Sequence, residues 1–118
     1  MTRVSMEGVP DFDKFEIVRK GKVTLASPNS AGSSTNVSVT HSLGYQPLVM
    51  AFVAFSSTGT KFPIPYMSVN VPTTGTIRYM VSMEVVGNNI ITFYHTDITD
   101  PSNVTDYITW YILREKSN

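Results

Sequence analysis

The fold of this chain is decided by residues 41–55, which read HSLGYQP and then LVMAFVAF. Gly44 and Pro47 bracket a turn in the first part, because glycine can adopt a positive φ and proline fixes φ and donates no backbone hydrogen bond. Residues 48–55 carry no polar side chain, and a run of this length after a turn is typical of a strand buried on both faces. We therefore expect the rest of the chain to pack around this strand.

Other segments alternate apolar and polar residues, as strands with one buried face do. The pattern is clearest over 77–85, and it recurs at 35–40 and 106–113. Gly87-Asn88 predicts a tight turn and therefore a hairpin over 76–95. Lys20-Gly21 predicts a second hairpin, between short strands at 15–18 and 22–25.

No segment shows a convincing helical period, and turn residues separate seven or eight short strands. This spacing predicts an all-β fold, an antiparallel β-sandwich. The length of 118 residues is typical of one domain, so we expect a single sandwich domain over 1–118. Residues 1–13 are predicted to form an irregular N-terminal arm, because glycine, proline and aspartate interrupt any periodicity there.

Composition excludes several functional classes. Nine basic residues balance nine acidic ones, whereas nucleic-acid-binding proteins usually carry a basic excess. No apolar run reaches membrane-spanning length, so neither nucleic acid nor membrane insertion is expected. The first residues, MTRVSME, lack the apolar core of a signal peptide, and we expect the protein to be made in the cytoplasm of the producing cell. No cysteine is present, which excludes thiolate chemistry.

The strongest candidate for a ligand site is the region from Tyr94 to Asp106. His95 and Asp97 share one face of a strand, and Asp100 and Asp106 follow nearby. A third zinc ligand at suitable spacing and the full calcium-loop pattern are both missing, so we predict no metal and no cofactor. The competing interpretation is a solvated acidic loop at the end of a strand. If a ligand binds, we expect it to contact Tyr94, His95, Asp97, Asp100 and Asp106.

No enzymatic activity is predicted. The only histidines are His41 and His95, and the Gly-x-Ser-x-Gly nucleophile motif is absent. A Ser-His-Asp triad assembled in space remains an alternative, because triads are defined by geometry and not by sequence position. We expect His41, which begins the turn, to hydrogen-bond to loop backbone.

The aromatic residues divide by their position along each strand. Trp110 shares parity with Ile108 and Ile112, which predicts a place in the core. Several tyrosines fall on the opposite, wetter parity of their strands, namely Tyr66, Tyr94, Tyr107 and Tyr111. Exposed tyrosines suit recognition of sugar or protein, and they also suit the cover of an outer sheet face or a subunit contact. Both interpretations stay open.

The strand at 48–55 also predicts association of the protein with copies of itself. Its side chains point alternately to two faces, with Leu48, Met50 and Phe52 on one and Val49, Val53 and Phe55 on the other. A two-sheet sandwich offers one interior, so a second apolar face needs another cover. We expect a homo-oligomer, a trimer. The alternative is that Phe12 and Phe15 in the N-terminal arm cover this face within one chain.

The opening MTRVS, the turn at 41–47 and the apolar strand after it resemble small proteins of bacteriophages and prophages. In those proteins a His-x-Leu-Gly-Tyr-x-Pro turn recurs in β-domains of tails, tail fibres and other appendages. The layout, with tryptophan in the last strand at 108–112, also resembles the H-type lectin domain. The first resemblance implies a structural or receptor-binding module of the virion, without catalytic activity, that contacts a cell-surface glycan or another virion protein. The second implies a carbohydrate-binding module, and both imply assemblies based on trimers.

Overall fold

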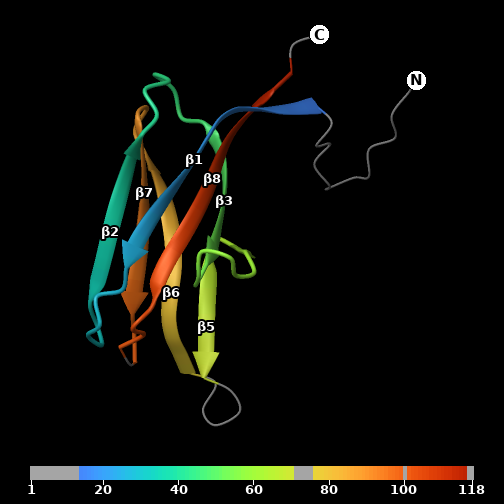
Figure 1. The fold of residues 1–118 in the computed structure, drawn as a ribbon. Helices are drawn as coiled ribbons and strands as arrows, with labels where there is room; N and C mark the ends of the chain where they lie inside the picture. The colour runs from blue at the N-terminus through green and yellow to red at the C-terminus, as the bar shows by residue number, and fades with distance from the viewer. Residues whose placement is uncertain (1–13, 71–75, 100, 117–118) are drawn as a thin grey trace.

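A computed structural model describes residues 14–70, 76–99 and 101–116, which form two antiparallel four-stranded sheets. The predicted all-β sandwich is confirmed. The first sheet, sheet A, contains in spatial order β1 (Phe15–Ala26), β8 (Thr105–Glu115), β3 (Leu48–Ala54) and β4 (Phe62–Pro63). The second, sheet B, contains in spatial order β2 (Ser34–Thr40), β7 (Ile90–Asp97), β6 (Thr76–Val86) and β5 (Tyr66–Asn70). In Figure 1 the β1, β8 and β3 layer crosses in front of β7 and β6.

The core lies between the sheets and is built by alternation along each strand. In sheet A, Ile108 of β8 lies between Val23 of β1 and Val53 of β3. From sheet B, Phe93 of β7 and Val81 of β6 are both fully buried against this layer. Trp110 belongs to the same core, as predicted. Because β8 pairs with β1 on one side and β3 on the other, it lies in the interior of sheet A.

The apolar strand β3 is not buried on both faces within one chain. Val53, on the inward face, is fully buried. On the outward face, Leu48 is 51% exposed and Met50 is 37% exposed. The predicted alternation of side chains is therefore correct, and these outward side chains remain open to solvent. Phe12, one of the two aromatic residues of the alternative cover, lies outside the described residues.

The hairpin predicted at Lys20-Gly21 is wrong. Residues 15–26 form one continuous strand that pairs with β8, with a register irregularity between Ile17 and Arg19. Gly21 lies opposite Trp110, and a Cβ atom added to it would lie 2.4 Å from the indole ring. The glycine therefore allows close packing against the tryptophan, and it does not form a turn.

The expectation that Tyr66 faces solvent is also wrong. Its ring lies 5.2 Å from the rings of both Phe55 and Phe62, in an aromatic cluster at the end of the core. The next residue, Met67, is 52% exposed. Tyr66 pairs with Val81 and therefore points inward with it. The inward and outward residues of β5 are thus the reverse of the prediction.

Two turns form as predicted. Gly87, with φ of 59°, begins the turn between β6 and β7, which confirms the hairpin. Gly44 has φ of 79° in the turn before β3. His41 is buried there, and its Nδ1 accepts a hydrogen bond from the Leu43 backbone N–H at 3.1 Å, as expected for a histidine that orders loop backbone. Within the described ranges, no helix is long and apolar enough to cross a membrane.

Candidate functional site

Three of the predicted site residues meet inside the sandwich. The Nδ1 atom of His95 lies 2.6 Å from Oδ2 of Asp106, and its Nε2 lies 3.0 Å from Oδ1 of Asp97. All three side chains are fully buried. The interpretation of this region as a solvated acidic loop is therefore wrong for Asp97 and Asp106. They form a closed polar cluster with His95.

The strands and the loop between β7 and β8 assemble this cluster. His95 and Asp97 lie on the inward face of β7, and Asp106 is on the inward face of β8. Ser102, in the connecting loop, donates its hydroxyl to Oδ1 of Asp97 at 2.6 Å and its backbone N–H to Oδ2 at 3.2 Å. The ring of Tyr79 stacks on the imidazole at 5.1 Å, so one face of the histidine is closed off.

The surroundings of the cluster set its charge. Burial alone lowers the pKa of His95, but hydrogen bonds and charge from Asp106 and Asp97 outweigh burial and raise that pKa. Burial favours a higher pKa for Asp97, yet the hydrogen bonds from Ser102 and His95 lower it. For Asp106, burial outweighs the contact with His95 and raises the pKa. Its Oδ1 accepts no hydrogen bond from the described residues.

Ser102, His95 and Asp106 have the connectivity of a Ser-His-Asp triad. The Ser102 hydroxyl oxygen lies 2.9 Å from His95 Nε2, whereas Asp106 contacts the other ring nitrogen. A triad needs an unprotonated Nε2 that takes the serine proton. Here the serine hydroxyl donates to Asp97, and the same carboxylate oxygen lies 3.0 Å from Nε2 of His95. This arrangement favours a charged histidine shared by two carboxylates, which suits a structural link and opposes a general base.

The remaining predicted residues lie elsewhere. Tyr94 points to the outer face of sheet B, where its hydroxyl donates to Glu84 at 3.1 Å. It lies on the opposite face of β7 from His95, so these neighbours do not share one surface. Asp100 lies outside the described residues.

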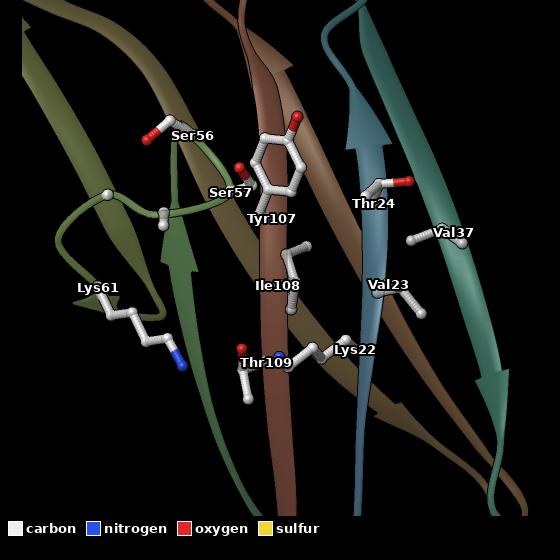
Figure 2. A pocket seen from close by; sticks show the side chains of 12 residues that line it. Lys22, Val23, Thr24, Val37, Ser56, Ser57, Lys61, Tyr107, Ile108 and Thr109 are labelled. Atoms are coloured by element: carbon white, nitrogen blue, oxygen red, sulfur yellow. The ribbon is translucent and has the colours of Figure 1, made fainter.

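A pocket of about 570 Å³ lies over β1, β8 and the loop after β3 (Figure 2). Its polar lining includes side chains that alternate with the core-facing residues of β1 and β8, namely Lys22, Thr24, Tyr107 and Thr109, and from the loop Ser57 and Lys61. Val23, Val37 and Ile108 supply an apolar part. The combination of apolar walls with a few polar groups is typical of small-molecule sites.

Sequence reasoning did not find this pocket. It identified Tyr107 as a tyrosine of wetter parity, but gave it no partners. The pairing of Lys22 with Thr109 and of Thr24 with Tyr107 comes from the β1–β8 register. The sequence did contain a signal for it, since threonine and tyrosine occupy the outward-facing positions of β8.

Comparisons with protein-family models, curated proteins and solved structures found no match to this chain. The resemblances to phage appendage domains and to H-type lectins therefore stay predictions. The features of this chain that bear on its function are its two outer sheet faces and the pocket.

Proposed function

We propose that this chain is a non-catalytic structural module that assembles with copies of itself through the outer face of sheet A. One observation carries this proposal, the apolar row Ile17, Leu113 and Leu48, which lies across β1, β8 and β3. Ile17 is 55% exposed and Leu48 is 51% exposed, while Leu113 between them is 9% exposed. Met50 and Tyr111 form the next row on the same face, and the exposed Lys20 of β1 ends that row. Exposed large apolar side chains gathered at one end of a sheet face are typical of protein interfaces.

The outer face of sheet B provides an internal comparison. Over β2 and β7 its cross-strand pairs are polar, with Ser34 hydrogen-bonded to Thr96 at 2.7 Å and Ser38 to Thr92 at 2.9 Å. Over β5 and β6 it also exposes apolar side chains, namely Met67, Val69 and Val86. Hydroxyl pairs of this kind suit a sheet that faces water. The contrast between the β2–β7 half of sheet B and the Ile17–Leu48 end of sheet A supports cover of sheet A by a second protein surface.

The free energy of covering this face is large enough for association. Burying each large apolar side chain contributes about 1.5–3 kcal/mol, and several such side chains offset the entropic cost of association. We propose a trimer, in line with the resemblance to phage appendage domains. That same resemblance supports a place in a virion, as a tail or appendage component.

Light scattering after size-exclusion chromatography tests the assembly. The native chain is expected to elute with the mass of a trimer, and Met50→Lys, which places a charge on the proposed interface, is expected to give monomers. Met67→Lys is the matched control, because Met67 is also exposed but belongs to the other sheet. A monomer mass for the native protein across concentrations would overturn the proposal.

A second function, carbohydrate recognition, is favoured by the pocket, which lies on the same outer face of sheet A, next to the row of Met50 and Tyr111. Its volume of about 570 Å³ lies within the range of small-molecule sites, roughly 300–1,000 Å³. Tyr107 offers an aromatic ring, and threonine and serine hydroxyls surround it. A cell-surface glycan is the partner that this function implies. A glycan array probed with the purified protein tests it, and an array without specific binding would count against it.

A further inference from the structure

We propose that the pocket binds an anionic saccharide, a sugar unit whose carboxylate or phosphate group contacts Lys22 and Lys61. This inference rests on the second proposed function, sugar recognition at the same pocket, and adds the charge of the ligand. Figure 2 shows the Lys22 side chain extending from β1 across β8, and the Lys61 side chain directed toward it from the loop after β3.

The charge of the pocket differs from the charge of the whole chain. The chain carries nine basic and nine acidic residues, so its formal net charge is zero. The pocket lining contains Lys22 and Lys61 and no aspartate or glutamate. Neither lysine forms an ion pair with a carboxylate among the described residues. Two ammonium groups that line one pocket without a carboxylate favour an anionic ligand there.

The rest of the lining indicates a sugar and not a bare anion. Tyr107 is half-buried and presents ring surface for the C–H face of a pyranose. The hydroxyls of Thr24, Thr109 and Ser57 can donate or accept, as the hydroxyls of a sugar can. A small inorganic anion would leave these groups and most of the pocket unused.

The same features argue against a nucleic acid strand as the ligand. Binding along a phosphate backbone requires a basic stripe that neutralises several phosphates. Here only two lysines line the pocket, and the chain as a whole has no net charge. One charged group on a compact ligand matches the site.

A titration followed by NMR of ¹⁵N-labelled protein tests the inference. The probes are glucuronic acid, glucose 1-phosphate, glucose and inorganic phosphate. The two charged sugars are expected to shift the amides of Lys22, Thr24, Tyr107 and Thr109, with affinity about tenfold above that of glucose. The stronger of the two identifies the anion as a carboxylate or a phosphate.

Charge-removing variants locate the contact. Lys22→Gln and Lys61→Gln are each expected to weaken the charged sugars by about tenfold and to leave glucose unchanged. Lys20→Gln is the matched control, because Lys20 lies on the same strand and face and does not line the pocket. It is expected to change affinity by less than about twofold. All three lysine side chains are exposed, so the variants keep the fold.

The outcomes separate the two levels of the proposal. If glucose binds the pocket as tightly as glucuronic acid, the anionic inference fails while sugar recognition stands. If inorganic phosphate binds as tightly as glucose 1-phosphate, or if no probe shifts the pocket amides, both fail. An equal loss of affinity in Lys20→Gln and Lys22→Gln would overturn the assignment of Lys22 as a contact.

Discussion

The imidazole of His95 and the carboxylate of Asp106 are 2.6 Å apart, and their contact joins the two sheets through the interior. His95 belongs to β7 of sheet B, and Asp106 belongs to β8 of sheet A. A buried ion pair adds little stability over an apolar pair of the same size, but removing one partner leaves an uncompensated buried charge. The chief effect of the cluster is therefore to fix how the two sheets are aligned.

Asp106→Ala is expected to reduce the free energy of unfolding by about 3–5 kcal/mol, because it leaves the buried imidazolium with one carboxylate fewer. Urea unfolding measures the change. Glu84→Ala is the control, since Glu84 is an exposed carboxylate that also accepts a side-chain hydrogen bond, and its loss is expected to cost less than about 0.5 kcal/mol. Similar losses in the two variants would show that burial of the cluster has no energetic consequence.

Stability is expected to fall as the pH rises above about 6.5, the ordinary pKa of histidine. The pKa of His95 is raised in the folded state, so its contribution is complete below 6.5 and is lost as the pH rises through the folded value. The slope from one proton is at most about 1.4 kcal/mol per pH unit. Urea unfolding between pH 6 and 9 measures it, and His95→Gln should remove the slope. A slope that persists in that variant would assign it to another group.

The stability of the fold at acid pH depends on Asp97 and Asp106, whose ionisation changes the stability in opposite directions. The pKa of Asp97 is lowered, so its contribution is present above about 3.8 and is lost as the pH falls through the folded value. The raised pKa of Asp106 means that its ionisation costs stability as the pH rises from about 3.8. Asp97→Asn is therefore expected to flatten the acid loss of stability between pH 4 and 2. An unchanged acid profile in this variant would contradict the assignment.

Gly21→Ala is expected to destabilise the fold by about 1–3 kcal/mol, because the new methyl group would overlap the ring of Trp110. Thermal unfolding and the fluorescence of the single tryptophan report the change together. Lys22→Ala on the neighbouring exposed position serves as the control. A neutral effect of Gly21→Ala would mean that the indole can move aside without cost.

Thermal stability is expected to rise with protein concentration, since association stabilises the folded chain by mass action. Calorimetry over a hundredfold range of concentration measures the midpoint of unfolding. In Met50→Lys this dependence should vanish, whereas Met67→Lys should retain it. A midpoint independent of concentration in the native protein would contradict assembly through sheet A.

Alternation along the strands was sufficient to predict the sandwich, because each buried face imposes a period of two on its own residues. The hairpin at Lys20-Gly21 was wrong because the reason for the glycine is the tryptophan opposite it, which lies far along the chain. Periodicity in one strand carries no information about its cross-strand neighbour. The same limit explains Tyr66, whose inward position follows from its pairing with Val81.

The candidate site was predicted in part. The spacing of His95 and Asp97 was enough to place both on one face, and the sequence placed Asp106 nearby. Their burial was not predictable, because it depends on how the β7–β8 loop closes over Asp97 through Ser102. The pocket was missed because its lining comes from β1, β2, β8 and the loop after β3, which only the strand order brings together.

The interior position of β8 in its sheet has a consequence for biosynthesis. Until residues 105–115 have left the ribosome, β1 lacks its sheet partner and β3 can pair only with the two residues of β4. Sheet B, by contrast, can form its β5, β6 and β7 ladder from consecutive segments as they emerge. The nascent chain must therefore hold an unpaired apolar β3 during much of translation, a period in which such strands are prone to aggregate. Slow translation of the last strand would lengthen that exposure and lower the yield of folded protein.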